Sequence, residues 1–255
     1  LPSAPLPQLA VVLPSNAIAV NRAWLPAVAL GARVALKPGA ADPYTPYRLV
    51  AALIAGGLPP ELFSVTPSDH AGTAALIGVY PRVQLFGDDA MVDRYRDDAS
   101  VQVNGPGRSA VVLGAEVPWS DHLDGLIDGI TRHDGRGGLN TSTIVTLAQP
   151  QVAAELADAL SQRVEGQILL CTDPADPRTR SERPEPHAAV VAVSADALPT
   201  WLGHRLAVAT FGLDEALVSR LLATGTVERH TPDALHNVDG TTNALHLERM
   251  GALLQ

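Results

Sequence analysis

Short apolar runs alternate with longer amphipathic stretches over the first part of the chain. The run at residues 9–13 ends at Pro14-Ser15, and the stretch at 20–30, which has helical spacing, ends at Gly31. The alternation continues with strands predicted at 34–36, 62–66, 83–86 and 109–113 and helices at 47–55, 71–79 and 88–96. Strands that alternate with helices in this way run parallel and are joined by crossover helices. The pattern therefore predicts the α/β class, with a Rossmann-like, doubly wound parallel sheet.

The remainder of the chain predicts a smaller α/β portion of the catalytic type. A helix at 119–133 leads into it, and it contains predicted strands at 168–171 and 188–193 and helices at 151–163 and 214–223. The proline-rich segment 173–186 predicts a surface loop. We therefore expect a cofactor-binding domain at 1–133, a second α/β domain at 134–228 and a C-terminal segment at 229–255.

Composition narrows the class of partner. The chain has 18 Lys+Arg against 27 Asp+Glu, a net charge of -9, which argues against nucleic acid because phosphates require clustered basic residues. No apolar run approaches the ~20 residues that cross a bilayer, so we expect no membrane span. The single cysteine, Cys171, excludes an internal disulfide and a cysteine-rich zinc site. Together these features favour a cytoplasmic protein whose partners are small molecules or other proteins.

A set of short motifs resembles the aldehyde dehydrogenase superfamily. They occur in the order and at the spacing of that family, over about residues 10–227, and are Leu13-Pro14-Ser15-Asn16, residues 24–30, Leu36-Lys37-Pro38, Thr45-Pro46, residues 55–59, Phe86-Gly87, residues 105–109 and Gly225-Thr226-Val227. The sequence is most similar to a divergent branch with Gly-Pro-Gly in place of Glu-Leu-Gly-Gly. The resemblance begins at the cofactor sheet, so we expect the family's N-terminal segment to lie outside this sequence. It implies an NAD(P)-dependent oxidoreductase for an aldehyde or acyl group, and a homo- or hetero-oligomer.

The resemblance also assigns candidate cofactor residues. Lys37, the only lysine, matches a family lysine that contacts the adenosine ribose, and Pro38 follows it. Gly87 and Asp88 occupy the turn where the family places Gly-Ser for the pyrophosphate. An aspartate there would cap the helix itself and repel a phosphate, so we expect dinucleotide binding to be weakened or rearranged. The family often has an acidic residue next to this lysine that selects NAD, and the aligned positions here are Gly39 and Ala40, so the choice between NAD and NADP stays open.

The catalytic positions depart from the family. Asn16 matches an asparagine that stabilises an oxyanion, or else caps the following turn. The segment that should contain the nucleophilic cysteine has Gly138 at that position in one alignment and Asn140 in another, and Thr141 is a nearby hydroxyl. Asn104 stands nearest the place of the general-base glutamate. Cys171 follows an apolar run and is predicted to be buried.

Two hypotheses follow. The first is an aldehyde dehydrogenase-like oxidoreductase whose cysteine mechanism has been lost. The second is a non-catalytic homologue that serves as an interaction or assembly subunit. The histidines lack the i, i+4 spacing of a helical zinc motif, so we assign no metal.

Overall fold

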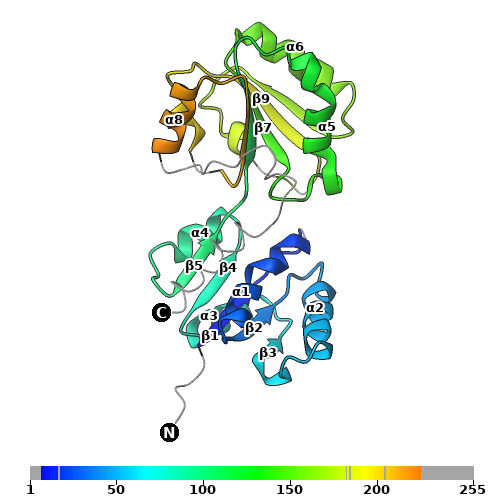
Figure 1. Ribbon diagram of the computed structural model, residues 1–255, viewed down its shortest axis with the longest axis vertical. Coiled ribbons are helices and arrows are strands. Elements are labelled where there is room, and N and C mark those ends of the chain that lie inside the picture. The colour runs from blue at the N-terminus through cyan, green and yellow to red at the C-terminus, as the bar shows by residue number, and fades with distance from the viewer. Residues whose placement is uncertain (1–6, 17, 182, 184, 204, 225–255) are drawn as a thin grey trace. The chain divides into compact units, whose positions relative to one another are not determined.

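The computed structural model in Figure 1 describes residues 7–224 apart from 17, 182, 184 and 204. The chain divides into two compact units between Gly105 and Pro106, whereas the sequence places the division after residue 133. Each unit is built on its own five-stranded parallel sheet. The predicted α/β class is therefore confirmed, and the predicted C-terminal segment 229–255 lies outside the described residues.

The first unit is a doubly wound sheet with strand order β3-β2-β1-β4-β5. Its strands are β1 (Gln8–Val12), β2 (Arg33–Lys37), β3 (Phe63–Val65), β4 (Val83–Phe86) and β5 (Val101–Asn104). Its helices are α1 (Leu25–Ala29), α2 (Tyr44–Ala55), α3 (His70–Val79) and α4 (Asp89–Tyr95), with 3₁₀ turns η1 (Ile18–Ala23) and η2 (Pro60–Leu62). Every strand pair is parallel.

The central strand β1 has apolar residues on both faces. Leu9 and Val11 lie in one core with residues of α1 and α2, whereas Ala10 and Val12 lie in another with residues of α3. Successive side chains of a strand point to opposite faces, so a continuous apolar run is what a strand covered by helices on both sides requires. This is why the run at 9–13 could be recognised as a buried strand.

The second unit has strand order β10-β6-β7-β9-β8. Its strands are β6 (Ser109–Leu113), β7 (Thr141–Thr146), β8 (Gln167–Cys171), β9 (His187–Ala192) and β10 (Val208–Phe211). Its helices are α5 (Leu123–Thr131), α6 (Pro150–Ser161), α7 (Leu198–Leu202) and α8 (Glu215–Ala223), with 3₁₀ turns η3 (Trp119–His122), η4 (Arg132–Gly135) and η5 (Pro177–Arg180).

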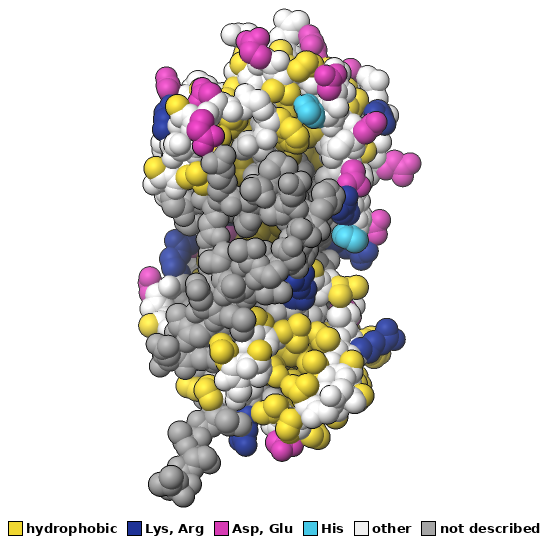
Figure 2. All heavy atoms as spheres, in the orientation of Figure 1, with side chains coloured by type: hydrophobic (Ala, Val, Ile, Leu, Met, Phe, Trp, Pro, Cys, Tyr) yellow, Lys and Arg dark blue, Asp and Glu magenta, His cyan; other side chains and the backbone are white. Residues whose placement is uncertain are grey.

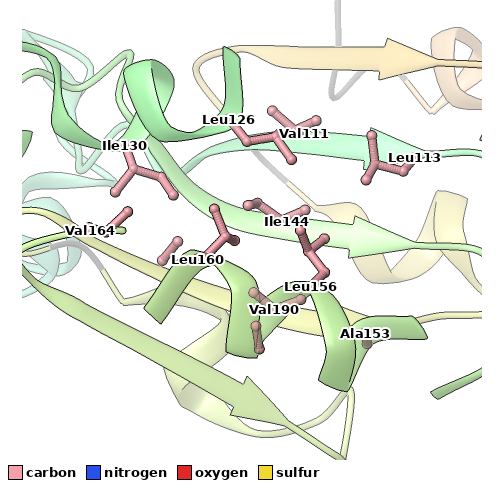
Figure 3. Packing of buried hydrophobic residues seen from close by; sticks show 12 residues of the cluster. Val111, Leu113, Leu126, Ile130, Ile144, Ala153, Leu156, Leu160, Val164 and Val190 are labelled. Carbon is pink, nitrogen blue, oxygen red and sulfur yellow. The ribbon is translucent and has the colours of Figure 1, made fainter. Parts of the chain in front are cut away.

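Helices α5 and α6 cover one face of this second sheet (Figure 3). Ile130 of α5 and Leu156 and Leu160 of α6 are fully buried in one cluster with Ile144 and Val190 of the strands. Residues of α7 and α8 form a second core on the opposite face. Both sheets are thus covered on both sides, as all-parallel sheets require.

Several elements differ from the sequence prediction. The strand at 109–113 was expected at the end of the first sheet, but as β6 it pairs with β7 and β10. Strands β5, β7 and β10 and the short helix α7 were not predicted. Helix α2 begins at Tyr44 and not at 47, because the Asp42 carboxylate accepts from the Thr45 N–H at 3.1 Å and Pro46 needs no acceptor in a first turn.

The predicted helix at 20–30 is divided into η1 and α1 near Pro26, since a proline starts a helix readily but cannot continue one. Within the described residues, no helix has the length and apolar character needed to span a membrane.

Candidate functional site

The predicted cofactor residues come together at the carboxyl edge of the first sheet. Asn16 follows β1, Lys37 ends β2 and is followed by Pro38, and Gly87 and Asp88 follow β4. Strands β1 and β4 are neighbours, and the chain winds outward from them in opposite directions. This is the topological switch point, where open α/β sheets bind ligands beyond the strand ends.

The loops after β1 and β2 are held tightly against each other. The Leu13 N–H donates to the Lys37 carbonyl at 2.8 Å, and the Ser15 hydroxyl accepts from the Ala41 N–H at 3.0 Å. A Cβ at Gly39 would lie 2.1 Å from the Ser15 oxygen, so only glycine fits there. The backbone around Lys37 is therefore well positioned, while its side chain is half-buried and that of Asn16 is exposed.

Asp88 caps the helix at this edge. Its carboxylate accepts from the Met91 N–H at 2.9 Å and closes the N-terminus of α4. The capping role expected for this aspartate is confirmed, and its carboxylate places a negative charge at the N-terminus of α4. Gly87 permits a close approach of the same helix, since a Cβ there would lie 2.6 Å from Met91 Cβ.

Asn104 ends β5 on the same sheet edge, opposite Phe86 in the register. Its carbonyl accepts from the Gly87 N–H at 3.1 Å. Its side-chain amide donates two long hydrogen bonds, each 3.4 Å, to the carbonyls of Leu85 and Gln102. The side chain is thus only loosely held.

In the second unit, Asn140 is engaged in the fold. Its Nδ2 lies 3.2, 3.0 and 2.7 Å from the carbonyl oxygens of Gly129, Ile130 and Arg132, and its Oδ1 accepts from the Gly137 N–H at 2.9 Å. The side chain closes the C-terminal end of α5. Both ends of the amide are therefore occupied by backbone groups.

Thr141 is also turned into the fold. It begins β7 and is 7% exposed. A Cβ at Gly129 would lie 2.8 Å from its hydroxyl oxygen, so α5 packs closely on this residue. The residue is therefore buried as a whole against α5.

The two adjacent glycines of this segment differ in the space around them. A Cβ at Gly137 would lie 2.6 Å from Asn140 Oδ1. A Cβ at Gly138 would lie 3.3 Å from the end of the Leu206 side chain and 3.8 Å from Gly107 Cα, and Gly138 has no positive φ. Gly107 in turn has no room for a side chain, because its Cβ would lie 2.2 Å from the Gly138 carbonyl oxygen. Position 138 is therefore the one of the pair that accepts a side chain.

Arg205 is a buried polar residue that the sequence analysis did not identify. Its guanidinium donates to the carbonyls of Leu202 at 3.0 Å and Arg108 at 2.9 Å and to the Thr143 hydroxyl at 3.0 Å, and a longer bond of 3.4 Å reaches the Thr179 carbonyl. The residue is 7% exposed. It joins segments next to β6, β7 and η5, and a lone arginine in the sequence carries no signal of such a role.

The electrostatics of Arg205 are unfavourable. Burial lowers its pKa to about 10, and the nearby positive charges of Arg180 and Arg108 act in the same direction. The guanidinium remains charged at neutral pH, where neutral carbonyl and hydroxyl oxygens satisfy it.

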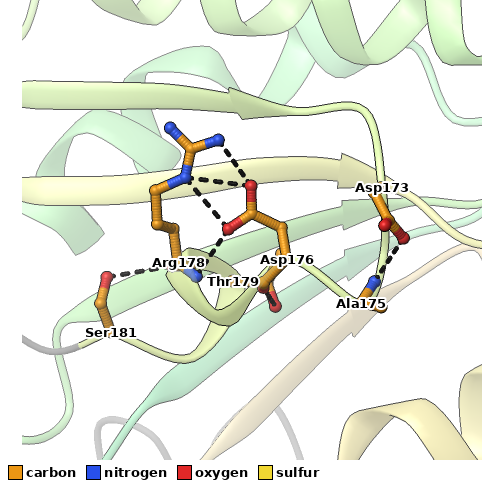
Figure 4. Close-up of polar contacts among 6 residues, drawn as sticks. All are labelled: Asp173, Ala175, Asp176, Arg178, Thr179 and Ser181. Atoms are coloured by element: carbon orange, nitrogen blue, oxygen red, sulfur yellow. Dashed lines mark hydrogen bonds and ion pairs between the residues drawn. The ribbon is translucent and has the colours of Figure 1, made fainter.

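Cys171 is buried at the end of β8, as predicted. Burial raises the pKa of its thiol, and the neighbouring Asp176 carboxylate raises it further, while Arg178 lowers it. Figure 4 shows the ordered loop that follows, in which the Asp176 carboxylate accepts from the backbone and side chain of Arg178. The sulfur is therefore a protonated, enclosed group at neutral pH. Within the described ranges, no three His, Cys, Asp or Glu residues are grouped to hold a metal ion.

Solved structures share this fold. A putative methylmalonate-semialdehyde dehydrogenase from Sinorhizobium meliloti 1021, complexed with NAD, has 16% identity and a TM-score of 0.71, and the match covers 86% of this chain and 59% of that one. A Mycobacterium tuberculosis aldehyde dehydrogenase complexed with NAD+ has 15% identity and a TM-score of 0.70, and the match covers 86% of this chain and 59% of that one. An indole-3-acetaldehyde dehydrogenase complexed with NAD+ has 15% identity and a TM-score of 0.72, and the match covers 88% of this chain and 59% of that one. The chain spans about three-fifths of the length of these structures.

A sequence comparison with curated proteins finds no match. The family model described as "Aldehyde dehydrogenase family" matches residues 4–181, which includes all of the candidate residues described above except Arg205. Together with the two parallel sheets and the ordered motifs at the strand ends, this match shows that the chain belongs to the aldehyde dehydrogenase family.

Proposed function

We propose that this chain is an aldehyde dehydrogenase-type oxidoreductase unit that binds NAD or NADP at the carboxyl edge of its first sheet and lacks the usual cysteine mechanism. The observation that supports it best is the meeting of Asn16, Lys37, Pro38, Gly87 and Asp88 at the switch point of a doubly wound sheet. Structures of similar fold that were solved with NAD support the choice of cofactor.

The residues at this edge fit one part of the dinucleotide better than another. Lys37 supplies a cation beside a tightly held backbone, which suits a ribose or a 2′-phosphate. Asp88 supplies a negative charge and already occupies a helix N–H, which does not suit a pyrophosphate at that helix. We therefore propose weak binding in which Lys37 holds the adenosine end. When bound, the nicotinamide would accept or donate a hydride.

The chemical step would proceed without a cysteine adduct. The only thiol is buried, and the amide of Asn140 is held by the backbone. Asn16, exposed at the same sheet edge as Lys37, is the group that we propose to donate a hydrogen bond to the carbonyl oxygen of an aldehyde or acyl substrate. Its role would be to orient the carbonyl and to stabilise negative charge on its oxygen.

Calorimetry with NAD and with NADP tests the binding part of the proposal. We expect measurable, weak binding of at least one of them and a loss of roughly tenfold in affinity for Lys37→Met, since removing one charge-assisted contact costs about 1.4 kcal/mol. The matched control is Arg33→Met at the opposite end of the same strand. Absence of binding of both dinucleotides to folded protein would refute the proposal.

The second candidate function is a non-catalytic assembly subunit, as a homo- or hetero-oligomer in the cytoplasm. The observation that favours it is the exposure of Tyr44 and Tyr47, at 69% and 62%, on the surface of α2. Figure 2 shows hydrophobic side chains gathered over the first unit on the face in view. Exposed apolar patches of this kind often mark protein interfaces.

A turnover assay separates the two candidates. Reduction of either dinucleotide in the presence of a panel of aldehydes, or oxidation with acyl thioesters, supports the oxidoreductase. Inactivity together with a stable oligomer in light scattering, lost on Tyr47→Ser, supports the assembly subunit. A monomer at every concentration would contradict the homo-oligomer and leave the hetero-oligomer as the form of the second candidate.

A further inference from the structure

The pair Asn104-Gly105 has chemistry of its own. It is the only Asn-Gly pair in the sequence. Glycine has no Cβ to shield its amide or to restrict its backbone. When glycine follows an asparagine, its backbone nitrogen therefore reaches the side-chain amide carbon of that asparagine more readily than the nitrogen of any other residue type would. The pair lies where β5 ends and the first unit gives way to the second.

Neither reacting group is enclosed in the fold, since Asn104 is half-buried and Gly105 is exposed. Gly105 is exposed and follows the last residue of the edge strand β5, and its N–H makes no hydrogen bond with the described residues. The Asn104 side chain is held only by two donor contacts of 3.4 Å, and its Oδ1 accepts no hydrogen bond from the described part of the chain. These two long contacts oppose rotation of the side-chain amide only weakly, and the main-chain hydrogen bond from the Gly87 N–H to the Asn104 carbonyl, at 3.1 Å, is the one that must open for the Gly105 nitrogen to reach Cγ.

The other asparagines provide a contrast within the same molecule. Asn140 is fixed by four contacts to the backbone and precedes the buried Thr141. Asn16 is exposed as Gly105 is, but it precedes an alanine. Only Asn104 combines a loosely held amide with an exposed glycine.

We propose that Asn104-Gly105 is a self-modification site that converts to aspartate and isoaspartate. The Gly105 nitrogen forms a bond to Cγ of Asn104 and loses its proton. The bond from Cγ to Nδ2 breaks, and ammonia leaves with that proton. Water then opens the resulting five-membered succinimide at either of its two carbonyl carbons, which gives the two products without any oxidant or enzyme.

The modification adds a negative charge at the end of β5, beside the β4 end that leads into Gly87 and Asp88. The isoaspartate product also lengthens the backbone by one methylene immediately before the boundary between Gly105 and Pro106. An effect of the charge on dinucleotide affinity rests on the function proposed above, whereas the modification itself does not.

Incubation of the full chain in warm, mildly alkaline buffer, followed by peptide mass spectrometry and labelling with an isoaspartyl methyltransferase, tests the proposal. We expect the peptide containing Asn104 to gain the mass difference between an amide and an acid roughly tenfold faster than the peptide containing Asn16, because only the former has glycine next. Isomerisation at an Asp-Gly pair also forms isoaspartate but changes no mass, so the mass gain distinguishes the reaction at Asn104 from it.

The matched variant is Gly105→Ala, whose new Cβ would lie 3.1 Å from Val92 Cγ2, a tight contact that a shift of a few tenths of an ångström relieves. It should slow the reaction by roughly tenfold, as steric restriction of the attacking nitrogen requires. Equal rates at Asn104 and Asn16 in the native chain would overturn the proposal. So would an aspartate product without isoaspartate, because direct hydrolysis of the amide forms no succinimide.

Discussion

The two units share one architecture but use their polar residues in opposite ways. At the carboxyl edge of the first sheet, the backbone is tied by short hydrogen bonds while the side chains of Asn16 and Lys37 remain exposed or half-buried. In the second unit, the side chains of Asn140 and Arg205 point inward and bond to backbone carbonyls. A polar side chain at a family motif is thus a ligand candidate only where the fold has left its donors unsatisfied.

The two units also differ in how far a charged side chain is buried. Arg205 is a buried charge whose pKa is lowered by desolvation and by two other arginines, so it must be held by several acceptors at once. Lys37, by contrast, is half-buried at the carboxyl end of β2.

The largest effect is expected from Arg205→Met. Removing the guanidinium leaves the carbonyls of Leu202 and Arg108 without the donor that they have in the native chain, and each buried unpaired group costs about 1–3 kcal/mol, so we expect a loss of about 2–5 kcal/mol in the stability of the second unit. Urea unfolding followed by hydrogen exchange of β6 and β7 measures it. Arg220→Met, which removes an exposed pair with Asp196, should change stability by less than about 1 kcal/mol. Equal losses of stability in the two variants would contradict the claim that the buried Arg205 contributes more than the exposed Arg220.

The next effect is expected from Asn140→Asp. The substituted oxygen would face three carbonyl oxygens in place of the donating Nδ2, so we expect a loss of about 2–4 kcal/mol. The same exchange at exposed Asn16 should cost less than about 0.5 kcal/mol. Thermal unfolding of both variants gives the comparison, and a stable Asn140→Asp protein would show that the cap contributes little.

The glycine pair of the second unit sharpens the comparison further. Gly138→Cys should cost less than about 1 kcal/mol, because its Cβ meets only the end of the Leu206 side chain, whereas Gly137→Cys should cost about 1–3 kcal/mol through its clash with Asn140. Stability and iodoacetamide labelling measure the outcome. The thiol introduced at position 138 should react faster than Cys171, and slower labelling would place that segment in the interior.

A smaller effect is expected at the edge of the first sheet. Asp88→Asn keeps the cap on α4 but removes the negative charge, so the affinity for NAD or NADP should rise about three- to fivefold, which corresponds to about 0.6–1 kcal/mol. Stability should change by less than about 0.5 kcal/mol, since asparagine is as good a cap as aspartate. Calorimetry measures the affinity of both proteins, and unchanged or weaker binding by Asp88→Asn would show that the Asp88 charge does not oppose cofactor binding.

The smallest effect concerns pH. The pKa of Cys171 is raised in the folded chain, so its contribution to stability is fully present below the unfolded pKa of about 8.5 and is lost as pH rises through the folded pKa. Stability of the wild type should therefore fall slightly more between pH of about 8 and 10 than that of Cys171→Ala. Parallel curves for the two proteins would contradict this.

Much of the first unit could be predicted because its strands are continuous apolar runs bounded by Pro and Gly. Strand β7 escaped prediction because its sequence, TSTIVT, is half threonine, yet all six residues are buried. Two of its hydroxyls donate to backbone carbonyls, that of Ser142 to Ser109 at 3.2 Å and that of Thr143 to Thr179 at 2.7 Å. Such an acceptor, 36 residues away, is invisible to periodicity.

The assignment of β6 shows the same limit at the level of domains. Its apolar pattern, SAVVL, identifies a buried strand but does not tell which sheet it joins. Pairing with β7 and β10 placed it in the second unit, so the boundary moved from residue 133 to Gly105.

By itself, the sequence determined the α/β class, the residues at the carboxyl edge of the first sheet, the cap at Asp88 and the lack of a second cysteine, because local patterns and the order of short motifs carry that information. Only the tertiary structure decided which polar groups are satisfied. Whether Asn140, Thr141 or Arg205 has a free donor depends on carbonyls brought near by chain segments distant in sequence, such as Arg108 and Arg205. Hydrogen-bond satisfaction is a property of the folded neighbourhood, and residue type alone does not reveal it.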